Sequence, residues 1–350
     1  MSGVLSVEVW RAPTPIPRPV LTAAGVYDTY FHLVVIVREG DFSGWGMSGM
    51  ATLQQLDDAV ECAARFVDGR LDLSRLLGVE RLGHDTVSRG ATNAISLAAW
   101  DFAARRLGVA CADLWGRRDN TAALACYGSG FFLDSTIDQL RDEARAYRDD
   151  GYRLVKMRTG ISVDDDLERF DAVREFFPHP GTVAVDSFHS WQPVEARAFA
   201  ERASAPLLWM EDATPYAQLG ELKGIGVPIA AGESLEIVAD LEELRDRGGM
   251  QYALLDVQRL GGPVLLLDAA VALAARGARI GSHVYTPQSA HLMACVDDPL
   301  PVEVFDWSDP LFAVPPRPNV DGRLTVQGPG FGVDLDFDFL HTHGARVGTA

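Results

Sequence analysis

The chain of 350 residues has few cysteines and no long apolar run. Its four cysteines are scattered and include no CxxC pair, which excludes a disulfide scaffold and indicates reduced, mostly buried residues. No uninterrupted apolar run approaches the roughly 20 residues that span a bilayer. The opening MSGVLSVEVWRAP lacks a basic segment followed by an apolar one, so we expect no signal peptide. We therefore expect a soluble, cytoplasmic protein.

Basic residues are also in short supply. Lysine and arginine number 31 against 49 aspartates and glutamates, for a net charge of −18. A surface this negative repels phosphate backbones and anionic lipids, so we expect neither nucleic acid nor membrane as a partner. Apolar residues at 47% and charged residues at 23% are ordinary for a globular protein.

The chain is longer than a single hydrophobic core usually supports, which favours two domains or a large barrel with an attachment. Strand-like runs followed by helical runs predict an α+β N-terminal domain at residues 1–115. Residues 116–310 alternate short apolar strands with amphipathic helices. Residues 311–350 form a turn-rich tail that we expect to return to the N-terminal domain, with its last ten residues loosely held.

Eight strand candidates alternate with seven helical stretches in the central region. The candidates span residues 124–130, 153–159, 182–188, 206–212, 228–234, 252–258, 279–285 and 301–307. This alternation predicts parallel βαβ units and, with eight strands, a (β/α)₈ barrel. A doubly wound open sheet is the alternative, but it usually carries a glycine-rich phosphate loop after its first strand, for which YGSGFF is a weak substitute.

Ionisable residues recur near the carboxyl ends of these strands, where barrel active sites are built. They are Lys156, Arg158, Asp186, Glu211, Glu233, Asp256, His283 and Glu303. Three of them, Asp186, Glu211 and Glu233, end successive strands, and three neighbouring anions repel one another unless a cation neutralises them. An all-carboxylate set suits Mg²⁺ or Mn²⁺. The alternative is that each acid pairs with a nearby arginine or lysine.

The remaining strand-end residues suit acid–base chemistry on a carboxylate. Asp256 and His283 end adjacent strands, so the carboxylate can orient the imidazole and raise its basicity. Lys156 and Arg158 are two residues apart and face the same side, where they make an anion-binding wall. Glu303 could act as a general acid or hydrogen-bonding electrophile if its pKa is raised.

The chain resembles the enolase superfamily and, within it, the mandelate racemase-like subgroup. The resemblance covers nearly the whole chain and rests on the ordered motifs VKMR, VAVD, WMED, AAGES, LLDVQRLGG, GSHVYTP, VEVFDW and GPGFGVDLD. It implies a (β/α)₈ barrel, modified from the regular form, with an α+β capping domain made by the N-terminal segment and the C-terminal tail.

The resemblance also implies roles for the strand-end residues. Asp186, Glu211 and Glu233 match Mg²⁺ ligands, and His283 matches a general base paired with Asp256. Lys156 and Glu303 match groups that contact the substrate carboxylate. The cofactor so implied is one Mg²⁺ per chain and the ligand a small carboxylate. Dimers or octamers are frequent in the family, so we expect a homo-oligomer.

Arg158 departs from the racemases of the family, which carry a second basic lysine at this position. Arginine is a poor proton acceptor at neutral pH, which favours a reaction with one base. The expected reaction is loss of water from an acid sugar, an aldonate or aldarate, through an enediolate to a 2-keto-3-deoxy acid. A racemase or epimerase of a 2-hydroxy acid is the first alternative, and an inactive homologue that binds metal and carboxylate is the second. A cycloisomerase would prefer a lysine on the sixth strand, where DVQR has none.

Three further positions are weaker candidates. His189, three residues after Asp186, is a possible second acid or a structural histidine. The segments TAAGVYDTY and GWGMSGM are expected to close over the barrel and set specificity, with Tyr27 and Tyr30 as substrate-binding residues. Core packing is the expected place of Trp45.

Overall fold

The computed structural model describes residues 5–22, 25–66, 73–81, 87–119 and 121–349. Residues 23–24 of the segment TAAGVYDTY, the first four residues and Ala350 therefore lie outside the described part. No helix in the described ranges combines the length and the apolar character needed to cross a membrane.

The N-terminal part is an antiparallel sheet packed against helices. Its strands, in spatial order, are β13 (Ala345–Thr349), β1 (Ser6–Thr22), β2 (Gly25–Glu39) and β3 (Phe42–Ser48). The helices are α1 (Leu53–Phe66), α2 (Leu73–Leu77), the 3₁₀ helix η1 (Val79–Arg81), α3 (Arg89–Leu107) and α4 (Cys111–Trp115). Gly44 and Gly46 on β3 have no Cβ, and this lets the strand contact the backbone of α3 directly.

Eight parallel strands follow. They are β4 (Ala123–Gly130), β5 (Val155–Arg158), β6 (Val183–Asp186), β7 (Met210–Glu211), β8 (Ile229–Ala231), β9 (Tyr252–Leu255), β10 (Arg279–Ser282) and β11 (Val302–Val304). Neighbours in the sheet follow chain order, and β11 pairs in parallel with β4. The amide of Leu300, just before β11, donates to the carbonyl of Ile280 on β10 (2.8 Å), so the ring is nearly closed. This order confirms the barrel and is wrong for an open doubly wound sheet.

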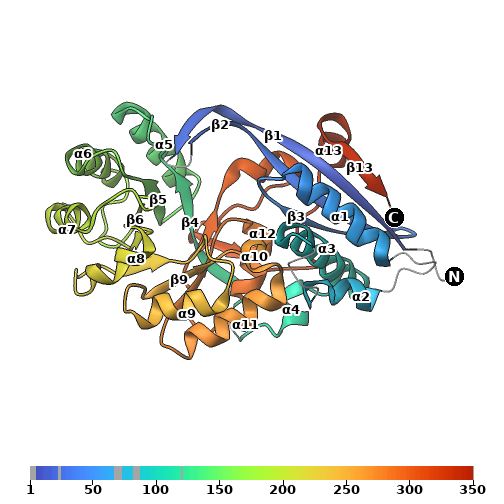
Figure 1. Cartoon of the computed structure of the whole chain (residues 1–350). Coiled ribbons are helices and arrows are strands. Elements are labelled where there is room, and N and C mark those ends of the chain that lie inside the picture. Colours follow the sequence, from blue (N-terminus) through green and yellow to red (C-terminus); the bar gives the residue numbers. More distant parts are fainter. Residues whose placement is uncertain (1–4, 23–24, 67–72, 82–86, 120, 350) are drawn as a thin grey trace.

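Helices surround the strands on the outside (Figure 1). They are α5 (Ile137–Asp149), α6 (Val163–Arg174), α7 (Pro193–Arg202), α8 (Tyr216–Leu219) with η2 (Gly220–Leu222), α9 (Val238–Asp246), α10 (Val257–Leu260), α11 (Pro263–Ala274) and α12 (Thr286–Met293). A 3₁₀ helix, η3 (Asp306–Leu311), follows β11 in place of a regular eighth helix. Inside the barrel, Tyr127 and Trp209 pack edge to face at 5.2 Å between ring centroids.

The tail contacts both parts of the molecule. Strand β12 (Arg323–Thr325) pairs with β4 of the barrel, whereas β13 pairs with β1. The helix α13 (Phe337–His343) lies between them. The expectation of a loosely held end is wrong, because backbone hydrogen bonds to β1 fix residues 345–349. The domain boundaries near residues 115 and 310 stay a prediction.

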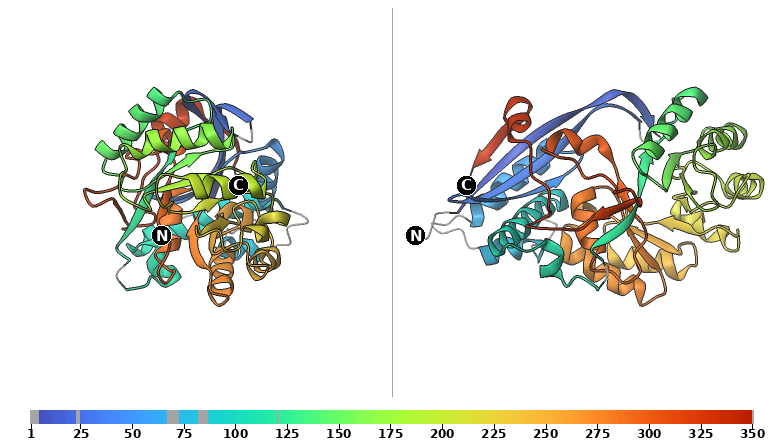
Figure 2. Two further views of the ribbon diagram at one scale, coloured as in Figure 1. Left: turned by 90° about the vertical axis from the view of Figure 1, so that its left-hand side faces the viewer. Right: turned by 180° about the vertical axis from the view of Figure 1, so that it is seen from behind.

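The hairpin of β1 and β2 arches from the helices α1 and α3 to the loop before α5, as both views show (Figures 1 and 2). At its far end the Leu133 amide donates to the Leu21 carbonyl (3.1 Å), and the Leu21 amide donates to Asp134 Oδ1 (3.1 Å). An ion pair joins Arg18 to Asp134 at 2.6 Å. The hairpin is thus anchored across the carboxyl end of the barrel.

Candidate active site

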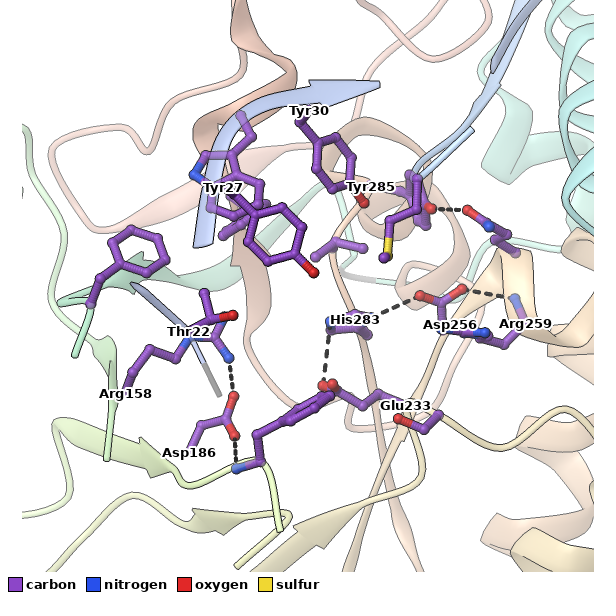
Figure 3. A pocket seen from close by; sticks show the side chains of 18 of the residues that line it. Thr22, Tyr27, Tyr30, Arg158, Asp186, Glu233, Asp256, Arg259, His283 and Tyr285 are labelled. Atoms are coloured by element: carbon purple, nitrogen blue, oxygen red, sulfur yellow. Dashed lines mark hydrogen bonds and ion pairs between the residues drawn. The ribbon is translucent and has the colours of Figure 1, made fainter. Parts of the chain in front are cut away.

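The eight strand-end residues predicted from the sequence lie together inside the carboxyl end of the barrel. The strand register places Asp186 beside Arg158 and Glu211 beside Asp186. In Figure 3, Arg158 and Asp186 lie on one side of the pocket, and His283 with Asp256 lies on the other.

Lys156 is a fully buried cation at the base of this group. Its side chain has no exposed surface, and its Nζ lies 2.5 Å from Glu211 Oε1 and 3.0 Å from Glu303 Oε1. Burial opposes the charge, but Glu211 and Glu303 outweigh it and raise the pKa of Lys156 well above its usual value. Lys156 is therefore charged at all physiological pH values.

Arg158 forms an ion pair with Asp186. Burial disfavours its charge, yet Asp186 and the neighbouring acids raise the pKa of Arg158 above its ordinary value. A guanidinium held in this way cannot accept a proton from a substrate. Its place on the face opposite His283 leaves that face without a base among the described residues of the pocket.

Asp186, Glu211 and Glu233 supply more negative charge than the nearby cations neutralise. Burial, together with Asp186, Glu233 and Glu303, raises the pKa of Glu211 to about 8, even though Lys156 lowers it. As the side chains stand, no three His, Cys, Asp or Glu residues within the described ranges are arranged to hold a metal. Lys156 and Arg158 hold Glu211 and Asp186 in ion pairs.

These carboxylates nevertheless fit a hard divalent cation. They are buried oxygen donors on three successive strands, the ligand type that Mg²⁺ prefers. Oε2 of Glu233 is buried and makes no hydrogen bond, although His283 Nε2 lies 3.3 Å away. A cation among the three would compensate the repulsion that raises the pKa of Glu211.

His283 and Asp256 form the predicted pair. His283 Nδ1 lies 2.7 Å from Asp256 Oδ2, and Asp256 Oδ1 accepts the Arg259 amide (2.9 Å) at the start of α10. Burial lowers the basicity of the imidazole, but Glu233 and Asp256 raise the pKa of His283 to about 9. With Nδ1 engaged by Asp256, Nε2 is the nitrogen free to meet a substrate.

Glu303 differs from its expected state. Burial would raise its pKa, but Lys156 and His283 hold the pKa of Glu303 below its usual range. Its Oε2 also accepts the Val284 amide at 2.8 Å. In this structure Glu303 is an ionised partner of Lys156, which is wrong for a carboxylic acid that donates a proton.

The structure does not bring His189 to the pocket. Its Nδ1 lies 3.0 Å from the Thr214 carbonyl, and its Nε2 lies 3.3 Å from Asp212 Oδ2. Phe188 lines the cavity in its place. Trp45 also lies elsewhere, buried in the core, where its indole donates to the Val333 carbonyl (3.0 Å).

A cavity of about 210 Å³ lies above the strand-end residues. Tyr27 and Tyr30, both expected from the sequence, line it. Sequence reasoning missed Phe132, Phe305 and Trp307, which also line it. Their signal was the aromatic residues that directly follow the first and last barrel strands, in FF and FDW.

A family model described as Enolase C-terminal domain-like matches residues 139–339, more than half of the chain. The chain belongs to this family. The fold of this family member also matches solved structures along its whole length. An L-talarate dehydratase from Polaromonas sp. JS666, complexed with Mg and L-glucarate, superposes with a TM-score of 0.85 at 24% identity, covering 100% of both chains.

Two curated relatives cover most of the chain. A 3,6-anhydro-alpha-L-galactonate cycloisomerase from Streptomyces coelicolor is 28% identical over 274 residues, covering 76% of this chain and 74% of that protein. An L-talarate/galactarate dehydratase from Salmonella typhimurium is 28% identical over 240 residues, covering 66% and 59%. These similarities confirm the enolase superfamily resemblance and indicate an enzyme.

Proposed function

We propose that this protein removes the proton α to a carboxylate of an acid sugar and then expels the β-oxygen, giving a 2-keto-3-deoxy acid. The observation that carries the proposal is the asymmetry of the pocket. His283 is oriented by Asp256 on one face, whereas Arg158, with its raised pKa, stands on the other. One base suffices for elimination but not for racemisation through two faces.

The metal and the cations serve the carboxylate end of the substrate. Asp186, Glu211 and Glu233 would hold Mg²⁺, which supplies Lewis acidity that makes the α-hydrogen more acidic. The solved dehydratase complexed with Mg and L-glucarate supports this assignment. Lys156 is positioned to hydrogen-bond a carboxylate oxygen and to stabilise the charge that develops there.

Each step can be written for the side chains of this chain. His283 Nε2 takes the α-proton as the C–H bond breaks, and the electron pair forms an enediolate. The ionised Asp256 holds the resulting imidazolium through Nδ1. The C–O bond at the β-carbon then breaks, His283 returns its proton to the leaving hydroxyl, and water departs. The enol tautomerises to the 2-keto acid.

A cycloisomerase is the second candidate, supported by the Streptomyces coelicolor relative. Its first step is the same, but the leaving oxygen belongs to a ring, so the ring opens and no water is lost. The missing lysine at the end of β9, where Asp256 stands, does not exclude this reaction, because His283 can serve as the base.

Proton NMR in D₂O with Mg²⁺ tests the proposal on a panel of aldonates, aldarates, anhydro-sugar acids and simple 2-hydroxy acids. We expect a 2-keto acid from at least one sugar acid and no reaction after EDTA treatment. Deuterium incorporation at the α-carbon without loss of the β-oxygen would instead indicate a racemase. Metal-dependent binding without any exchange would indicate an inactive homologue.

A further inference from the structure

The wall of the cavity remote from the charged residues is aromatic. Trp307 lies at its centre, with ring centroids 4.6 Å from Phe305, 5.3 Å from Tyr30, 5.4 Å from Tyr27 and 5.7 Å from Phe132. We call these five residues the aromatic shelf. All five line the cavity, so the shelf faces whatever is bound above His283.

The shelf is a fixed surface built from three separate segments. Tyr27 and Tyr30 come from β2, Phe132 follows β4, and Phe305 and Trp307 follow β11. Phe132 and Trp307 are 8% and 7% exposed and stack with 21° between their ring planes. Because the hairpin tip is anchored at Leu21, the rings have little freedom to move away.

Polar groups beside the shelf are already engaged. The Tyr30 hydroxyl is hydrogen-bonded to the backbone of Met50. The Tyr285 hydroxyl accepts from the Gly49 amide (2.8 Å) and donates to Gln258. The Tyr27 hydroxyl points into the pocket above His283 (Figure 3).

An open-chain sugar acid carries a hydroxyl on each carbon beyond the reacting pair. Against aromatic faces these hydroxyls would be buried without enough partners, at a cost of about 1–3 kcal/mol for each unsatisfied group. A flat, carbon-rich group gains instead from contact with tryptophan and tyrosine rings. The composition of this wall therefore favours rings over chains.

We propose that the aromatic shelf binds a ring at the remote end of the substrate, either an aryl ring or the C–H face of a sugar ring. The proposal rests on the proposed function, which places the substrate carboxylate at Lys156 and the α-carbon at His283. The shelf then selects cyclic acids over open-chain polyols. Tyr27 and Trp307 are specificity-determining residues for this choice.

Three acids that share a 2-hydroxyl and a β-oxygen test the selection. They are 3,6-anhydrogalactonate with a sugar ring, galactonate as its open-chain counterpart, and 2,3-dihydroxy-3-phenylpropanoate with an aryl ring. With Mg²⁺ present, we expect kcat/KM for at least one cyclic acid to exceed that for galactonate by about tenfold or more, and the preferred cyclic acid identifies the ring type.

Two variants connect this selectivity to the shelf. Trp307→Leu and Tyr27→Leu should each lower the ratio of kcat/KM between the preferred cyclic acid and galactonate by about tenfold. Tyr27 is only partly buried, so its variant should fold even where Trp307→Leu does not. Phe42→Leu, at an exposed ring on β3, is the matched control and should keep the ratio.

Equal or better turnover of galactonate, or an unchanged ratio in a folded Tyr27→Leu, would overturn the proposal. Equilibrium binding to the Mg²⁺ form separates this failure from failure of the proposed function. Ring-selective binding without α-proton exchange on any acid contradicts the function alone. Efficient turnover of the open-chain acid contradicts the shelf alone.

Discussion

The floor of the cavity and the aromatic shelf above it are built in opposite ways. On the floor, each barrel strand from β5 to β11 contributes one or two ionisable groups at or near its carboxyl end, and burial makes their charges interact strongly. The shelf has no charged member and is assembled from β2 and the segments after β4 and β11. The chemistry thus depends on position along single strands, whereas the shape presented to the substrate depends on how distant segments meet.

The largest effect on stability is expected from the floor, on replacement of Lys156 by methionine. Removing one partner of a buried ion-pair network leaves Glu211 and Glu303 uncompensated and should lower the free energy of unfolding by about 3–5 kcal/mol. Urea denaturation in EDTA measures the loss, and Mg²⁺ should restore part of it. The exposed Lys223→Met is the control. A Lys156→Met protein as stable as the wild type would show that charge does not organise the floor.

A buried acid without a cation, outside both regions, gives a smaller, pH-dependent effect. Glu80 accepts hydrogen bonds from Ser96 and from the amides of Val264 (2.9 Å) and Leu265 (3.1 Å) at the start of α11. Burial raises the pKa of Glu80 to about 7, so the folded state binds a proton that the unfolded state releases at lower pH.

The wild type should therefore lose stability relative to Glu80→Gln as pH rises from about 4.5 to about 7, by up to about 3 kcal/mol. Below that window the two proteins should differ by a constant amount. Denaturation curves of both proteins at several pH values give the difference. A difference that does not change with pH would mean that Glu80 titrates normally in the folded chain.

The smallest effect is expected at His189, which the structure places behind the pocket. A general acid contributes about 100-fold or more to a rate, and His189→Asn should instead keep kcat within about threefold of the wild type. NMR rates on the best substrate check this. A loss of 100-fold or more would return His189 to the catalytic group and extend the floor beyond the cavity.

Much of the floor was predictable because barrel geometry maps a strand end in the sequence onto one face of the fold. Lys156, Asp186 and His283 lie where their strand positions predicted. The protonation state of Glu303 was not predictable, since it depends on the 3.0 Å contact with Lys156. The eight strands were predictable from their apolar runs and the helices between them.

The shelf could be predicted only in part. Tyr27 and Tyr30 were suggested by an aromatic segment expected to cover the barrel, but nothing local marks Trp307 as their neighbour. That contact requires the hairpin of β1 and β2 to reach the barrel and dock near Asp134. The pairing of the last residues with β1 was missed for the same reason, because their exposed, polar side chains carry no pattern that names a partner.

The central claim is that His283 is the only base acting on the α-proton, and His283→Asn tests it most directly. The measurement is deuterium exchange and elimination at the α-carbon in D₂O with Mg²⁺, followed by NMR on a substrate that the wild type turns over. We predict a loss of about 1,000-fold or more in both, with the fold and thermal stability largely retained. Exchange that continues near the wild-type rate would contradict the one-base mechanism and assign the proton to another group.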